Sequence, residues 1–82
     1  MKRNYVSETK TLRQKLGHVI EECGEVCAAA GKTLRWGLDS FNPELPAANR
    51  ETNVVWLIRE FNDLRKAMDR CQQAIESGEE LL

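Results

Sequence analysis

Two long segments with apolar residues at helical spacing take up most of this 82-residue chain and leave few folds open to it. In each segment the apolar positions recur every three or four residues, which confines them to one stripe about 120° wide on an α-helix. In the first segment these positions are Leu12, Leu16, Val19, Ile20, Cys23, Val26, Cys27 and Ala30. In the second they are Val54, Leu57, Ile58, Phe61, Leu64, Met68, Cys71 and Ile75. The pattern therefore predicts an all-α fold built on two long helices.

Capping residues set the expected ends of these helices. The first should run from about Ser7, a suitable N-cap, to about Ala30, with Gly31 as its stop. The second should begin near residues 49–52 and end at Ser77, with Gly78 as its stop.

The connector, residues 32–50, has a mixed composition. Residues 33–38 either extend the first helix by a turn or form a short helix of their own, ended by Gly37. Asn42 before Pro43 is a cap followed by a first-turn proline, so residues 43–48 are expected to form a brief helical piece.

Two antiparallel amphipathic helices about 35 Å long cannot enclose both apolar stripes by themselves. The simplest remedy is a second copy of the chain, which would complete a four-helix bundle by homodimerisation, or a dimer of dimers. We expect residues 1–82 to form a single domain, with 1–6 and 78–82 as frayed tails.

Composition narrows the classes of function. The net charge is −1 without a block of like charge, which gives no support to nucleic-acid binding. Neither a signal peptide nor an apolar run of membrane-spanning length is present, so we expect a cytoplasmic protein without a membrane partner. The three cysteines are expected to be buried free thiols, since a zinc site shared with a second copy lacks CxxC spacing and a nearby ligand histidine.

Two pairs of carboxylates at one-turn spacing are the strongest candidates for a functional site. Glu22 and Glu25, preceded by Glu21, lie on the first predicted helix, and Glu60 and Asp63 lie on the second. Residues three apart share a helix face, so two antiparallel helices could bring the four carboxylates together. Because such a group repels itself, it favours a hard cation such as Mg²⁺ or Mn²⁺.

The alternative for each pair is a solvated face or a set of salt bridges. Glu21, Glu22 and Glu25 have no cation four residues later, which weakens this alternative for the first pair. Both pairs flank their apolar stripes, a position that suits a cleft between helices. The small residues Ala29 and Ala67 lie beside the pairs and are expected to leave space for a ligand.

The order Glu21-Glu22-Cys23-Gly24-Glu25, followed by Glu60-Phe61-Asn62-Asp63, resembles the EExxE…ExxD pattern of the MazG-like, all-α nucleoside triphosphate pyrophosphohydrolases. The resemblance covers roughly residues 12–70. In this chain the spacer between the two acidic groups is longer than is usual in the family, and residues 32–53 look like an inserted loop.

The resemblance implies Mg²⁺-dependent hydrolysis of a nucleoside triphosphate, in the ribo or deoxy form, to the monophosphate and pyrophosphate. It implies that Glu22, Glu25, Glu60 and Asp63 ligate Mg²⁺, for which Mn²⁺ could substitute. Glu21 is then the spare carboxylate, as general base or as support for the metal ligands.

Other residues remain open between two interpretations. Lys32, Arg35 and Trp36 could meet a triphosphate and stack on a base, or else be solvated cations and a core indole. His18 is expected to be a hydrogen-bonding structural residue rather than a ligand, and Trp56 to pack either beside the site or at a dimer interface. A solvated surface is expected for Arg59, Lys66 and Arg70, which share a face of the second helix away from its apolar stripe.

Two other classes of function stay open. One is a catalytically silent module that binds nucleotide and metal. The other is a non-enzymatic helical dimerisation or adaptor protein whose acidic face meets a basic partner.

Overall fold

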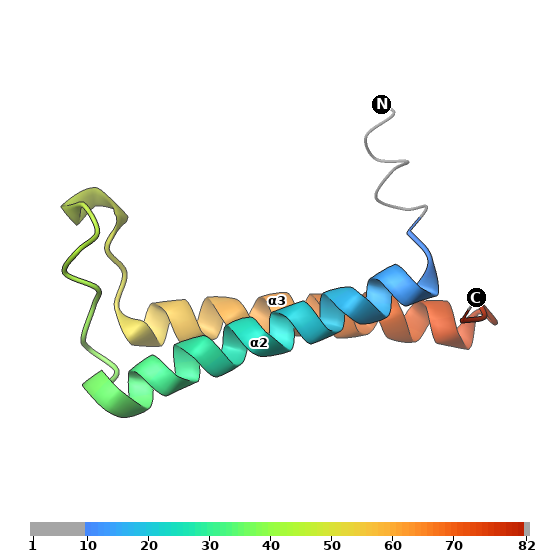
Figure 1. The fold of residues 1–82 in the computed structure, drawn as a ribbon, viewed down its shortest axis with the longest axis horizontal. Helices are drawn as coiled ribbons and strands as arrows, with labels where there is room; N and C mark the ends of the chain where they lie inside the picture. Colours follow the sequence, from blue (N-terminus) through green and yellow to red (C-terminus); the bar gives the residue numbers. More distant parts are fainter. Residues whose placement is uncertain (1–9, 82) are drawn as a thin grey trace.

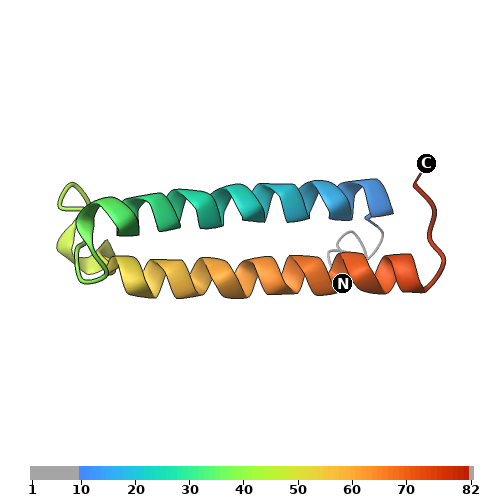
Figure 2. The same cartoon turned by 90° about the horizontal axis from the view of Figure 1, so that it is seen from below.

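The computed structural model describes residues 10–81, and within them two long helices lie side by side and antiparallel (Figures 1 and 2). Helix α2 spans Leu12–Trp36 and helix α3 spans Asn53–Glu76. The connector between them stands at one end of the hairpin and contains a short 3₁₀ helix, η1, over Ala47–Asn49. No β-strand is found in the described part of the chain, so the all-α prediction is confirmed. Neither α-helix is long and apolar enough to cross a membrane.

Helix α2 differs from its predicted bounds at both ends. It starts after Thr11, whose hydroxyl accepts from the backbone N–H of Gln14 while the Gln14 side chain accepts from the Thr11 N–H. The predicted N-cap, Ser7, lies outside the described residues. Gly31 does not stop the helix, and α2 ends instead at Gly37, whose φ of 96° favours glycine. The prediction of a stop at Gly31 is therefore wrong, and the alternative of an extension ended by Gly37 is confirmed.

Helix α3 has the predicted bounds. Thr52 caps its N-terminus, and the chain leaves the helix at Ser77 and Gly78, the latter with a φ of 90°. The segment that follows is tied to the hairpin, because the Glu79 N–H donates to the Ala74 carbonyl at 3.0 Å. The Glu79 carboxylate also lies 3.3 Å from the Lys15 ammonium. Residue 79 thus contacts both helices, and the prediction of a frayed tail over residues 78–82 stays a prediction.

The connector folds back on itself rather than forming the helix predicted over residues 43–48. A turn begins at Pro43, and the helical piece is the 3₁₀ helix that follows Pro46. The Arg50 guanidinium donates to the carbonyls of Leu45 and Pro43, both at 2.8 Å, and stacks 5.2 Å from the centroid of Phe41. These contacts close the connector into a compact loop over the end of the hairpin.

The two helices meet along a seam in which spacings of three and four residues alternate, as in a coiled coil. Its α2 members are Leu12, Lys15, Val19, Glu22, Val26, Ala29 and Thr33, all buried or half-buried. Its α3 members are Asn53, Leu57, Glu60, Leu64, Ala67, Cys71 and Ala74, also all buried or half-buried. Two of these positions, where apolar residues are the norm, carry glutamates.

The small residues of the seam bring the helices close together. Ala29 is fully buried and Ala67 is 1% exposed. The prediction that these alanines leave space for a ligand is therefore wrong, since the facing helix fills that space. Because a larger side chain at the seam has no room, it has to push the helices apart.

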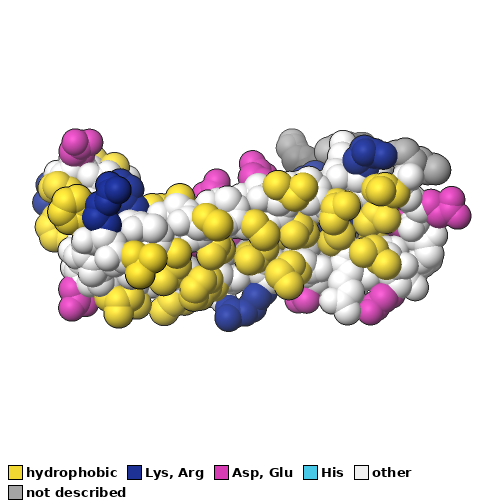
Figure 3. Space-filling view, turned by 60° about the horizontal axis from the view of Figure 1, so that its bottom comes forward, with side chains coloured by type: hydrophobic (Ala, Val, Ile, Leu, Met, Phe, Trp, Pro, Cys, Tyr) yellow, Lys and Arg dark blue, Asp and Glu magenta, His cyan; other side chains and the backbone are white. Residues whose placement is uncertain are grey.

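About half of each predicted apolar stripe lies outside the seam. The exposed residues of the stripes are Leu16, Ile20, Cys23, Cys27, Ile58, Met68 and Ile75. Figure 3 shows hydrophobic side chains gathered along this side of the hairpin over both helices. The prediction of buried thiols is confirmed for Cys71 and wrong for Cys23 and Cys27 in the single chain.

Overpacking the seam tests its geometry. Ala67→Leu is expected to lower the free energy of unfolding by about 1–3 kcal/mol. Ala67 is 1% exposed, so the larger side chain has no free space between the helices. Thermal unfolding followed by circular dichroism measures this as a Tm lower by several degrees. Ala28→Leu, at an exposed position of α2, is the control and should leave Tm nearly unchanged. An equal change of Tm in the two variants would contradict the close packing of the helices at Ala67.

Candidate metal centre and adjoining pocket

Three carboxylates converge at the middle of the hairpin. Glu22 of α2 and Glu60 and Asp63 of α3 each offer an oxygen, and these atoms all lie within 4.8 Å of one another. Glu60 is only 4% exposed, whereas Glu22 and Asp63 are half-buried. The seam brings these three predicted residues together because positions 22 and 60 both belong to it, while position 63 lies one turn from position 60.

Two side chains hold the buried carboxylate of Glu60. The indole Nε1 of Trp56 donates to Oε2 at 3.1 Å, and Nη1 of Arg59 donates to the same oxygen at 3.3 Å. Among the described residues no partner takes the other oxygen, Oε1. Trp56 therefore lies beside the carboxylates, one of the two places predicted for it, and leaves one Glu60 oxygen for a ligand.

Glu22 is held in a similar way from its own helix. His18 Nε2 and Glu22 Oε2 lie 3.2 Å apart, one turn from each other on α2. This contact confirms that His18 is hydrogen-bonded. His18, Glu21 and Glu22 also form a second group with ligand atoms within 4.8 Å, so Glu21 adjoins the three-carboxylate group through Glu22.

One predicted metal ligand stands apart. Glu25 is exposed and belongs to neither group of potential ligands in the described residues. It lies one turn along α2 from Glu22, on the outer side of the seam.

Arg59 is a site residue that the sequence analysis missed. Beyond Glu60, its guanidinium pairs with Glu51 at the end of the connector. The hydrogen bond to Glu51 is the main cause that raises the pKa of Arg59 above its ordinary value, and the charges of Glu51, Glu60 and Asp63 add to it. Arg59 is thus a permanent cation at the edge of the carboxylate group. Because Glu51 lies eight residues away and outside α3, helical spacing gave no signal of this pair.

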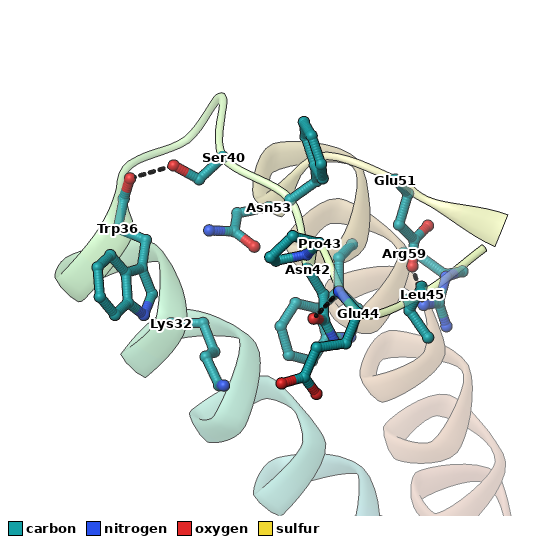
Figure 4. Close-up of a pocket in the computed structure, with 12 residues that line it drawn as sticks. Lys32, Trp36, Ser40, Asn42, Pro43, Glu44, Leu45, Glu51, Asn53 and Arg59 are labelled. Atoms are coloured by element: carbon teal, nitrogen blue, oxygen red, sulfur yellow. Dashed lines mark hydrogen bonds and ion pairs between the residues drawn. The ribbon is translucent and has the colours of Figure 1, made fainter. Parts of the chain in front are cut away.

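A cavity of about 710 Å³ opens between the connector and the helix ends (Figure 4). Its lining comprises Lys32, Trp36, Ser40, Phe41, Asn42, Pro43, Glu44, Leu45, Glu51, Asn53, Trp56 and Arg59. Two of the predicted substrate residues, Lys32 and Trp36, are among them. The third, Arg35, lies instead at a shallower depression of about 270 Å³ beside Cys27 and Lys32.

The cavity and the carboxylates are neighbours. Trp56 and Arg59 line the cavity and also donate to Glu60, so a single layer of side chains separates the cavity from that carboxylate. Cavities of this volume are typical of small-molecule sites, in which apolar and aromatic walls carry a few polar groups.

No family model, curated protein or solved structure matches this chain.

Proposed function

We propose that the protein is a Mg²⁺-dependent nucleoside triphosphate pyrophosphohydrolase, which cleaves a ribo- or deoxyribonucleoside triphosphate to the monophosphate and pyrophosphate. The convergence of Glu22, Glu60 and Asp63 carries the proposal. A seam position is normally apolar, and a buried carboxylate there lowers stability unless it is compensated. Arg59 offsets part of the charge of Glu60, but it also pairs with Glu51, so three carboxylates whose oxygens lie within 4.8 Å of one another favour a further cation.

The donor set fits a hard divalent cation. Glu22, Glu60 and Asp63 present carboxylate oxygens, which Mg²⁺ and Mn²⁺ prefer. Glu25, exposed one turn along α2, is proposed as the fourth ligand on the resemblance alone. When bound, Mg²⁺ neutralises phosphate oxygens and lowers the pKa of a coordinated water. The proposed metal residues are thus the four that the resemblance implies.

The remaining polar groups supply binding and proton transfer. Arg59, at the edge of the carboxylates, is a cation placed to bind phosphate oxygens, and Lys32 is a second cation open to the substrate in the cavity. Glu21 is exposed beside Glu22 and can accept the proton of the attacking water. His18 holds Glu22 in place through its hydrogen bond.

The active form is proposed to be a homodimer, or a dimer of dimers, in which two hairpins complete a four-helix bundle. Exposed apolar residues on both helices support this assembly, since Ile20 is 69%, Ile58 52% and Ile75 56% exposed in the single chain. The chain is also extended: its radius of gyration is 16.0 Å, whereas a compact domain of this length is expected near 12 Å. A second copy would cover the apolar side of the hairpin and compact the assembly.

The direct test is pyrophosphate release from the eight common ribo- and deoxyribonucleoside triphosphates with Mg²⁺ or Mn²⁺, and with a chelator as control. We expect release from a subset, and none with the chelator. Nucleotide binding without release would instead indicate a catalytically silent binding module. Absence of both nucleotide binding and any effect of Mg²⁺ would indicate a helical adaptor.

The bond from Trp56 to Glu60 gives a second prediction. Trp56→Phe keeps an aromatic ring in place but removes the N–H that donates to Glu60, so the carboxylate loses part of its orientation. Mg²⁺ affinity, measured by isothermal titration calorimetry, is expected to fall about 10–100-fold. The control is Phe61→Tyr. Phe61 is a half-buried aromatic residue of α3 whose side chain has no hydrogen-bond donor, so this substitution should leave Mg²⁺ affinity unchanged. Unchanged Mg²⁺ affinity in Trp56→Phe would remove this residue from the metal site.

A further inference from the structure

The cavity beneath the connector has aromatic walls. Trp36, Phe41 and Trp56 come from α2, the connector and α3, and all three line it. Trp36 is 62% exposed, so its indole is open to a binding partner. Aromatic side chains on three walls suit a flat heterocycle, because every nucleobase has a face on which a ring can stack.

Hydrogen bonds within the protein decide which polar atoms remain for a ligand. The Asn53 Nδ2 group donates to the Gly37 carbonyl at 2.9 Å, which identifies the nitrogen of this amide and leaves its oxygen as an acceptor. The Ser40 hydroxyl donates to the Trp36 carbonyl, so its oxygen too is left as an acceptor. Asn53 and Ser40, which line the cavity, therefore each keep an acceptor oxygen.

Glu44 adds the strongest acceptor. Its backbone N–H is bonded to Asn42 at 3.0 Å, which fixes the turn, while its carboxylate has no hydrogen-bond or ion-pair partner among the described residues. Figure 4 shows the Glu44 and Lys32 side chains reaching toward one another across the cavity. Lys32 is a donor only, so the two sides of the cavity differ in polarity.

This arrangement discriminates between bases. Cytosine presents an exocyclic amine next to acceptors, so its amine can donate to a carboxylate while N3 and O2 accept from an ammonium. Uracil has an oxygen where cytosine has the amine, and that oxygen would face a carboxylate without a hydrogen between them. Adenine and guanine also carry exocyclic amines, whereas thymine shares the pattern of uracil.

We propose that the connector cavity holds the nucleobase of the substrate and selects bases with an exocyclic amine over uracil and thymine, with Glu44 as the residue that accepts from the amine. The identity of the ligand as part of a nucleotide rests on the proposed function. Binding of a free nucleoside needs neither metal nor hydrolysis and can be measured separately.

The experiment is titration of the 82-residue chain with cytidine and with uridine, without metal, followed by tryptophan fluorescence and by calorimetry. The two nucleosides match in size and sugar. Cytidine is expected to bind at least about tenfold more tightly, the effect of one hydrogen bond to a charged group. In Glu44→Gln this ratio is expected to fall toward one, because an amide can donate to the uracil oxygen. Glu80→Gln, an exposed carboxylate near the C-terminal end of the chain, should keep the wild-type ratio.

Equal or tighter binding of uridine, an unchanged ratio in Glu44→Gln, or no binding of either nucleoside would overturn the inference. Trp36→Ala gives a second measure: both nucleosides should bind at least about tenfold more weakly, with unchanged helicity by circular dichroism. Cytidine preference without pyrophosphate release from any triphosphate would sustain this inference and remove the proposed function. Release at equal rates from CTP and UTP, together with equal nucleoside affinities, would support the proposed function and contradict this inference.

Discussion

Replacing Asp63 with asparagine is expected to lower the rate of metal-dependent pyrophosphate release by about 100-fold or more. The substitution keeps the shape of the side chain and removes one of the three charges that converge between the helices. Metal binding weakens because a neutral amide oxygen attracts a divalent cation less than a carboxylate does. Steady-state kinetics with the preferred triphosphate, at several Mg²⁺ concentrations, measure the effect.

The matched control is Asp69→Asn, on the same helix at an exposed position. It should retain the wild-type rate. Thermal unfolding separates metal loss from misfolding: Mg²⁺ at 100 times its Kd should stabilise the wild-type chain by about 2.7 kcal/mol and leave Asp63→Asn unaffected. Wild-type activity in Asp63→Asn, or equal loss in both variants, would contradict the metal site.

Replacing Ile20 with lysine is expected to dissociate the assembly. Ile20 is 69% exposed in the single chain, on the apolar side that a second copy would cover. Burying an isoleucine side chain contributes about 1.5–3 kcal/mol, and a symmetric dimer loses this twice, so the dissociation constant should rise at least about 100-fold. Sedimentation equilibrium should give the wild-type chain about twice its 9.4 kDa mass and shift the variant toward the monomer.

Gln73→Lys, an exposed position of α3 away from the apolar side, adds the same charge and should remain dimeric. Unfolding of Ile20→Lys on dilution would support the same conclusion, because the stability of an obligate dimer depends on protomer concentration. A wild-type chain that sediments as a monomer, or an Ile20→Lys variant that keeps the dimer mass, would contradict the assembly.

The helices could be predicted because local rules govern them. Helix α3 begins after the side-chain cap of Thr52 and ends before Gly78, which has a positive φ. Both features depend on neighbouring residues only. The end of α2 was predicted wrongly at Gly31, because a glycine can also stay in helical conformation at a cost of about 1 kcal/mol. Helix α2 continues beyond Gly31 because Thr33 is half-buried in the seam. The Thr33 hydroxyl also donates to the Ala29 carbonyl one turn earlier.

The site was predictable only in part. Glu22, Glu60 and Asp63 were found from their one-turn spacing and their order, whereas the same spacing gave equal weight to Glu25, which the structure leaves exposed. Arg59 was missed because its partner Glu51 belongs to the connector. The cavity was missed for the same reason, since its walls come from three separate elements.

The sequence by itself determined two helices, the capping residues of α3, an excess of apolar surface and two acidic pairs, because these follow from local capping rules and from spacing along a helix of known pitch. Only the tertiary structure decided which side of each stripe forms the seam. The small residues Ala29 and Ala67 let the helices approach along a line that includes Glu22 and Glu60, and the larger apolar residues are left outside. That choice depends on how two surfaces fit together, and it is what places the carboxylates between the helices.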